Sequence, residues 1–268
     1  MTERPLPLWT LNESDPRAPS EAVWRRMTPA ERDRVVATLP SEFPVDQTRP
    51  PEGDPHFNAK MNARKTLERF FARHGRRVYL ACELPVYYPE EPMFAPDVMG
   101  VVDVELHERM SWVVSKEERG LDFALEIYVA GDRRKDHIAN VERYARLGIA
   151  EYFIFDRGRL RLSGYRLPEA SARRYDPILP QFGHYKSGVL GLELALEGEK
   201  LRFFHGDAPV PEAEELIGKL EGMVNQLELR LEEEAKLREE EAKLREEAEA
   251  KLAKVLLELE ALKRGERP

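Results

Sequence analysis

The chain has 268 residues and a formal net charge of −8, of which residues 212–268, with 17 acidic and 11 basic side chains, contribute −6. The rest is close to neutral, so overall acidity does not exclude a nucleic-acid partner. Cys82 is the only cysteine, which excludes an intramolecular disulfide and a multi-cysteine zinc site. No apolar run reaches the ~18 residues of a membrane span, and residues 1–17 lack a signal-peptide pattern, so we expect no membrane association and a cytoplasmic location.

The N-terminal region, residues 1–50, is predicted to be a Pro-rich arm followed by a helical segment. Thr28 is a helix N-cap, Pro29 takes the first helical position and Glu31 completes a capping box. Pro40 ends this helix, and the Pro-rich sequence up to Pro55 predicts a long loop.

Residues 51–210 are expected to form one α/β domain. A helix with apolar residues at helical spacing begins near Asp54 and ends at Gly75, and strands are predicted for residues 78–88 and 98–106. The apolar run 121–129 has the pattern of a central strand covered on both faces. It is followed by a helix from about residue 136 to 147 and a strand at 151–156, which predicts a βαβ unit and a mixed sheet flanked by helices. Further strands are expected within 160–205.

Residues 211–268 are predicted to be one long charged helix. The heptad EEEAKLR occurs twice in succession, at 232–238 and 239–245, and leucine and valine recur every three or four residues on either side of it. This pattern favours a weak or stuttered coiled coil over a solitary helix held by Glu–Lys pairs, and hence a homo-oligomer through this helix.

Two carboxylates are the candidate functional groups. Glu126 lies within the apolar run "FALEIYV", where a carboxylate is costly unless it is paired, protonated or bound to a cation. Asp97 stands at the mouth of another predicted strand. Two carboxylates on adjacent strands facing one crevice can hold Mg²⁺ or Mn²⁺, which activates water and neutralises charge at a phosphodiester.

An ordered set of motifs carries a resemblance that reaches from about residue 56 to 205. The set comprises Pro96-Asp97, "FALEIYV" with Glu126, Asp136, Tyr144, "LGIAEYFIFD" (147–156), "SGYRL" (163–167) and "LGLELAL" (190–196). With these motifs the chain resembles the Uma-type restriction endonucleases of the PD-(D/E)XK nuclease superfamily. The resemblance implies a restriction-endonuclease-like fold and a metal-dependent endonuclease that cuts DNA. It also implies that Asp97 and Glu126 are the catalytic, metal-binding pair, with the carbonyl of Ile127 as a further ligand.

The chain departs from the family at the catalytic lysine. The position two residues after the glutamate is Tyr128, and the helix position where many Uma-type members carry lysine is Asn140. Arg133, Arg134 and Lys135 are candidate substitutes and candidate phosphate contacts, and a solvated helix entry is an equal alternative for them.

Other residues have simpler interpretations. Glu83 is expected to be an edge or solvent-facing residue rather than an extra metal ligand, and His56 a surface residue of a helix's first turn. Tyr144, Tyr152 and Trp112 are expected to pack in the core. The alternative to a nuclease is a nuclease-fold protein without catalysis that serves as a DNA-binding or coiled-coil interaction module, which Asn140 favours and the two carboxylates oppose.

Overall fold

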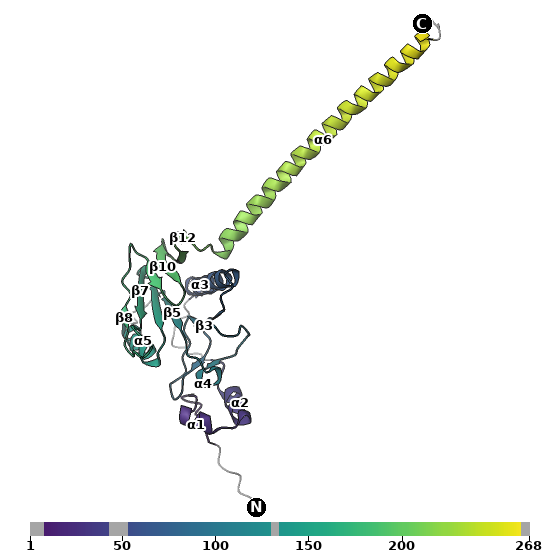
Figure 1. The fold of residues 1–268 in the computed structure, drawn as a ribbon. Coiled ribbons are helices and arrows are strands. Elements are labelled where there is room, and N and C mark those ends of the chain that lie inside the picture. The colour runs from purple at the N-terminus through teal and green to yellow at the C-terminus, as the bar shows by residue number, and fades with distance from the viewer. Residues whose placement is uncertain (1–7, 43–52, 130–133, 264–268) are drawn as a thin grey trace, which may run out of the picture. The chain divides into compact units, whose positions relative to one another are not determined.

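The computed structural model describes residues 8–42, 53–129 and 134–263, and the side chains of residues 134–137, 262 and 263 lie outside that description. The chain divides into two compact units, Met1–Glu212 and Ala213–Pro268. Among the described residues, the first unit contains the strands β1 to β12 and the helices α1 to α5, and the second contains the helix α6 (Figure 1).

The first unit is built on a six-stranded mixed sheet in the order β1-β3-β5-β6-β7-β8. Its strands are β1 (Val78–Ala81), β3 (Val98–Val102), β5 (Phe123–Tyr128), β6 (Glu151–Asp156), β7 (Arg161–Arg166) and β8 (Asp176–Pro177). The pair β5–β6 is parallel and the other pairs are antiparallel. The predicted mixed α/β sheet is therefore confirmed.

The parallel pair is joined by helix α5 (Arg134–Leu147), as the βαβ pattern predicted. The helix stops at Gly148, whose φ of 80° lies in the left-handed region that glycine adopts without strain. The almost continuous apolar run of β5 follows from its place between β3 and β6, where both faces of the strand are covered.

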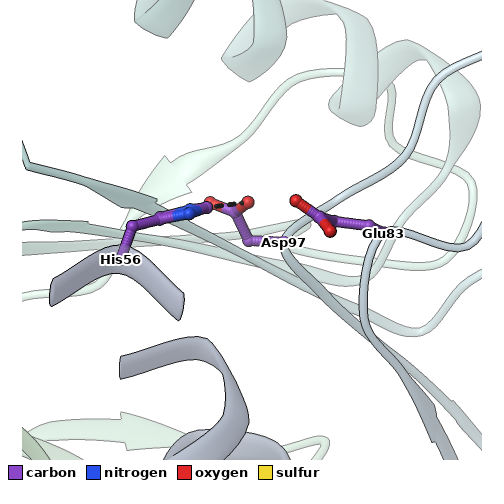
Figure 2. Close-up of side chains that lie close together, drawn as sticks. All are labelled: His56, Glu83 and Asp97. Carbon is purple, nitrogen blue, oxygen red and sulfur yellow. Dashed lines mark ion pairs between the residues drawn. The ribbon is translucent and has the colours of Figure 1, made fainter. Parts of the chain in front are cut away.

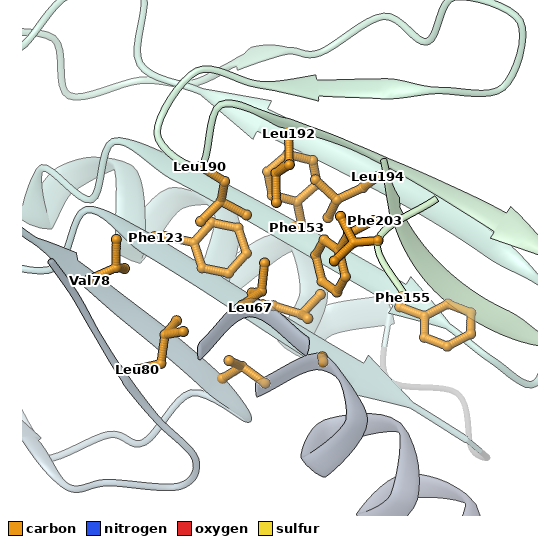
Figure 3. Packing of buried hydrophobic residues seen from close by; sticks show 14 of the residues in the cluster. Leu67, Val78, Leu80, Phe123, Phe153, Phe155, Leu190, Leu192, Leu194 and Phe203 are labelled. Carbon is orange, nitrogen blue, oxygen red and sulfur yellow. The ribbon is translucent and has the colours of Figure 1, made fainter. Parts of the chain in front are cut away.

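Helix α3 (Gly53–Arg73) covers one face of this sheet. Leu67 and Phe71 on its inner side pack with Phe123 and Phe153 of the sheet, and a second sheet closes the same core (Figure 3). This antiparallel sheet has the order β12-β11-β10-β9, with strands β9 (Tyr185–Ser187), β10 (Leu192–Glu197), β11 (Lys200–His205) and β12 (Ala208–Pro209).

The opposite face of the mixed sheet packs against α5 and is rich in aromatic rings. Tyr144 of α5 and Tyr152 of β6 lie edge to face, with ring centroids 4.9 Å apart, and both are buried. Trp112 is fully buried in the same cluster. The prediction that these three residues pack in the core is confirmed.

The N-terminal helices α1 (Glu21–Arg26) and α2 (Pro29–Thr38) form a third, smaller core. The capping box of α2 is present: the Glu31 amide donates to Thr28 Oγ1 and the Thr28 amide donates to Glu31 Oε2. Trp24 and Val35 pack against Tyr87 of β2 (Val86–Tyr87), which pairs with β4 (Trp112–Val113). The short helix α4 (Val114–Glu117) follows β4 directly.

Two predicted strands differ from the structure. The segment 78–88 is broken into β1 and β2, which belong to different sheets, because Glu83 has a φ of 50° and Pro85 cannot donate to a ladder. The segment 98–106 ends early, because Asp103 takes a φ of 58° directly after β3. Both segments leave the sheet at a residue whose backbone takes the left-handed conformation, which turns the chain.

Helix α6 spans Ala213–Lys263, 51 residues, which confirms the long C-terminal helix. Leu220, Leu227 and Leu231 are among its exposed leucines. Coiled-coil pairing of this helix stays a prediction. None of the helices in the described parts of the chain is both long and apolar enough to cross a membrane.

Candidate nuclease site

Asp97 and Glu126 face each other across two strands. Strands β3 and β5 pair with Val98 opposite Leu125, and one further step of this antiparallel register places Asp97 opposite Glu126. Directly opposed side chains in an antiparallel pair lie on the same face. Burial, and then the negative charge of Asp97, raise the pKa of Glu126 well above its ordinary value. The structure thus brings the two predicted carboxylates together.

Glu126 has a partner that offsets part of the cost of burial. The hydroxyl of Tyr144 on α5 donates to Glu126 Oε1 at 2.8 Å. Burial and the neighbouring Glu126 carboxylate raise the pKa of Tyr144 well above its ordinary value, so this hydroxyl keeps its proton and remains a donor. Tyr144 therefore both packs in the core and orients a carboxylate, which explains how an apolar strand tolerates Glu126.

Asp97 is fixed by two different groups. Its Oδ2 accepts a hydrogen bond from the Ile127 amide at 2.6 Å, and its Oδ1 lies 2.9 Å from His56 Nε2. His56 belongs to the first turn of α3 and is only 5% exposed. The expectation that His56 is a surface residue is therefore wrong: its first turn is packed against the sheet, and the imidazole points at Asp97 (Figure 2).

Glu83 approaches the same carboxylate from the turn between β1 and β2. Its amide donates to the Pro96 carbonyl at 3.0 Å, which ties the turn to the residue before Asp97. The Glu83 side chain is 59% exposed, as its solvent-facing interpretation implied, but it also faces the cluster (Figure 2). One ligand atom each from His56, Glu83 and Asp97 lies within 4.8 Å of the others.

These donors match the chemistry of a divalent cation site. Carboxylate oxygens suit Mg²⁺ and Mn²⁺, and an imidazole nitrogen suits the transition metals. Asp97 belongs to two possible sets of ligands: Glu126 lies opposite it in the sheet, and His56 and Glu83 lie beside it. A cation in contact with Asp97 and Glu126 would relieve the repulsion that now raises the Glu126 pKa. The residues present therefore fit a divalent cation.

A lysine that the sequence analysis overlooked stands next to this cluster. Lys60 lies one turn after His56 on α3, and its ammonium is 2.6 Å from Glu83 Oε1. The spacing of four residues on a helix was the available signal, because it places His56 and Lys60 on the same face. Without a known partner for that face, the spacing alone did not indicate a site.

The structure does not describe the side chains of the other predicted cations. Arg133 lies outside the described residues, and α5 begins at Arg134, but the side chains of Arg134 and Lys135 are not described. Their role in nucleic-acid binding stays a prediction. Tyr128 is half-buried against the aromatic cluster beneath α5, and Asn140 lies on α5 itself.

A basic groove lies between α5 and the strands β6 and β7. It is a cavity of about 1220 Å³ lined by α5, β6, β7 and the segment 173–177, and it includes the four arginines Arg159, Arg161, Arg173 and Arg174. Arg159 pairs with Asp156, whereas no ion pair within the described part of the chain involves Arg161 or Arg174. Ile154 in the wall is the register partner of Glu126, so the groove begins one strand away from that carboxylate.

The mixed sheet with helices on both faces defines an α/β protein. The model of the Uma2 family, described as "Putative restriction endonuclease", matches residues 45–197, and the chain belongs to this family. A crystal structure of a protein from Anabaena variabilis, described as a putative nuclease belonging to DUF820, is 12% identical with a TM-score of 0.43, over 55% of this chain and 80% of that one. No curated protein matches the sequence. The family match confirms the resemblance drawn from the sequence motifs.

Proposed function

We propose that this protein is a metal-dependent endonuclease that hydrolyses phosphodiester bonds of DNA. The observation that carries the proposal is the closeness of Asp97, which directly precedes β3, to Glu126 of β5, with His56 and Glu83 beside Asp97. Membership of a family described as restriction endonucleases supports the same reaction class.

In this proposal Asp97 and Glu126 hold Mg²⁺ or Mn²⁺, and Glu83 or His56 completes the set. A bound divalent cation supplies a water of lowered pKa and neutralises charge on the phosphodiester. The chain itself fixes the ligands: the Ile127 amide holds one oxygen of Asp97, and the Tyr144 hydroxyl holds one oxygen of Glu126. Such fixed positions reduce the reorganisation needed at the moment of reaction.

The basic groove supports DNA as the substrate. Arg161 and Arg174 line this groove, whose wall includes Ile154, the register partner of Glu126, and guanidinium groups recognise phosphate oxygens in two-point contacts. We expect the DNA backbone on either side of the cut to lie against these two arginines. Contacts from Arg133, Arg134 and Lys135 would add to this binding.

Cleavage of supercoiled and linear DNA with Mg²⁺ or Mn²⁺ tests the proposal. Asp97→Asn and Glu126→Gln should each abolish cleavage, while Asp103→Asn should not. Asp103 is a matched control because it lies at the other end of β3, is exposed and takes a left-handed conformation that asparagine tolerates.

A folded, metal-supplied protein that cleaves none of these substrates would overturn the proposal. If that protein still binds DNA, the alternative function, a DNA-binding module with a nuclease fold, takes its place. If cleavage survives both Asp97→Asn and Glu126→Gln, the carboxylate pair is not the site.

We also propose that α6 associates with a second copy of the chain. Leu220, Val224, Leu227 and Leu231 recur at spacings of four, three and four, and all four are exposed. Apolar side chains in this pattern are covered when two helices pair. Light scattering after gel filtration should report a dimer or higher oligomer for the intact chain, and a monomer would contradict this proposal.

A further inference from the structure

The lysine beside the acidic cluster is buried, although a lysine is normally a surface residue. The Lys60 side chain is 6% exposed and sits on the inner side of α3, between His56 and Ala63, which are also buried. An ammonium in such a place is costly unless it is paired. Its ion pair with Glu83, at 2.6 Å, provides that compensation.

The two partners of this ion pair are buried to different extents, which argues against a purely structural role for Lys60. Glu83 is 59% exposed and holds a φ of 50°, a strained conformation for a residue other than glycine. Exposed ion pairs typically contribute about 0–1 kcal/mol to stability, and apolar side chains in place of a whole buried ion pair are often neutral or stabilising. Stability alone therefore gives little reason for a lysine at position 60.

The neighbourhood of Lys60 is the candidate site itself. Burial raises the pKa of the Cys82 thiol to about 12, and the charges that also act on this thiol include Lys60, Glu83 and Asp97. Glu83 is within 4.8 Å of ligand atoms of His56 and Asp97. The ammonium is thus separated from these ligands by a single carboxylate.

We propose that Lys60 is the cationic residue of this site and that its ammonium contacts a non-bridging oxygen of the phosphodiester that is cut. This inference rests on the proposed nuclease function. Neither Tyr128 nor Asn140 can carry a positive charge, whereas α3 places the ammonium of Lys60 2.6 Å from Glu83 Oε1, beside the cluster. When Glu83 serves as a ligand, the N–H donors of Lys60 become available to the phosphate.

The chemistry requires no change in the charge of Lys60. A water oxygen forms a bond to phosphorus while the bond from phosphorus to the leaving oxygen breaks. The water loses a proton to solvent, and the leaving oxygen takes one from solvent. Negative charge increases on the non-bridging oxygens in the transition state, and a fixed ammonium stabilises that charge.

The test compares Lys60→Met, Lys60→Arg and the control Lys65→Met, which removes an exposed lysine from the same helix. For Lys60→Met we expect a loss of about 100-fold or more in the single-turnover cleavage rate at saturating Mn²⁺, the scale of one lost electrostatic contact. Lys60→Arg should retain part of the rate, and Lys65→Met should match the unaltered protein. Titration with Mn²⁺ should give similar metal affinities for all of them.

A binding experiment without cleavage separates this inference from the proposed function. In Ca²⁺, the affinity of Lys60→Met for DNA should fall, and the slope of log affinity against log salt should decrease by about 1. If the unaltered protein never cuts DNA but this loss appears, the nuclease proposal fails and the phosphate contact stands. If Lys60→Met binds and cleaves normally, or if more Mn²⁺ restores its rate, the inference is overturned.

A melting experiment covers the remaining structural explanation. Lys60→Met should melt within a few degrees of the unaltered protein, because the partner left behind, Glu83, is largely exposed. A strongly lowered melting temperature, together with a cleavage loss that follows the unfolded fraction, would make the ion pair structural and would overturn the proposal.

Discussion

Glu126→Gln should stabilise the metal-free protein at alkaline pH, although it removes a residue of the candidate site. Burial and the charge of Asp97 raise the Glu126 pKa in the folded state, so its ionised form is disfavoured by folding. Two unit charges 4 Å apart interact by about 4 kcal/mol at an effective dielectric constant of 20. The neutral amide escapes this repulsion and still accepts the hydrogen bond from Tyr144.

The net gain is smaller than the full repulsion, because the glutamate can take up a proton and because its bond from Tyr144 favours the charged form. We expect Glu126→Gln to gain about 1–2 kcal/mol in free energy of unfolding at pH 8, which raises the melting temperature by roughly 2–8 °C for a unit of this size. The sign follows from linkage. Below the ordinary glutamate pKa of 4.5, Glu126 is protonated in both the folded and the unfolded state. As the pH rises from 4.5 through the raised pKa of the folded state, the unfolded state loses this proton first. The unaltered protein therefore loses stability relative to the variant over this pH range.

The assay is thermal melting in EDTA from pH 4 to pH 9, with Glu108→Gln, an exposed carboxylate, as the control. Addition of Mn²⁺ should reverse the order of stability, because only the unaltered protein keeps both carboxylates for the cation. The reasoning is refuted if Glu126→Gln melts below the unaltered protein at pH 8 in EDTA, or if the difference between them does not grow with pH.

Three further predictions concern other parts of the molecule. Glu151 is 3% exposed, and its carboxylate accepts hydrogen bonds from the Ser187 hydroxyl and from the amides of Gly188 and Val189. Glu151→Gln should therefore lower the free energy of unfolding, measured with urea, by about 2–4 kcal/mol. An unchanged urea midpoint would contradict this. Arg161→Ala and Arg174→Ala should each reduce the salt slope of DNA binding by about 1, with metal affinity unchanged, and unaltered slopes would exclude the groove as the DNA surface. A chain that ends at Glu212 should keep the melting temperature of the first unit, because its three hydrophobic cores contain no residue of α6, whereas a lower temperature would show that α6 stabilises it.

Local patterns in the sequence were sufficient for much of the fold. The capping box at Thr28 and the βαβ unit around α5 depend on interactions between residues close in sequence or on one continuous apolar run, and both were predicted correctly. The family motifs likewise identified Asp97 and Glu126 as the carboxylates to examine. Their meeting across β3 and β5 agrees with that prediction, and their role in catalysis stays a proposal.

The sequence by itself determined the α/β order of elements, the long charged helix and the two carboxylates, because helix caps, strand patterns and heptads are local properties. Only the tertiary structure decided what surrounds Asp97. His56 precedes it by about 40 residues, and Glu83 reaches it because the chain breaks between β1 and β2 at a left-handed residue. Lys60 joins the cluster through the packing of α3 on the sheet. Spacing along a chain fixes contacts within one helix or strand, whereas contacts between elements depend on the register and packing of the whole core.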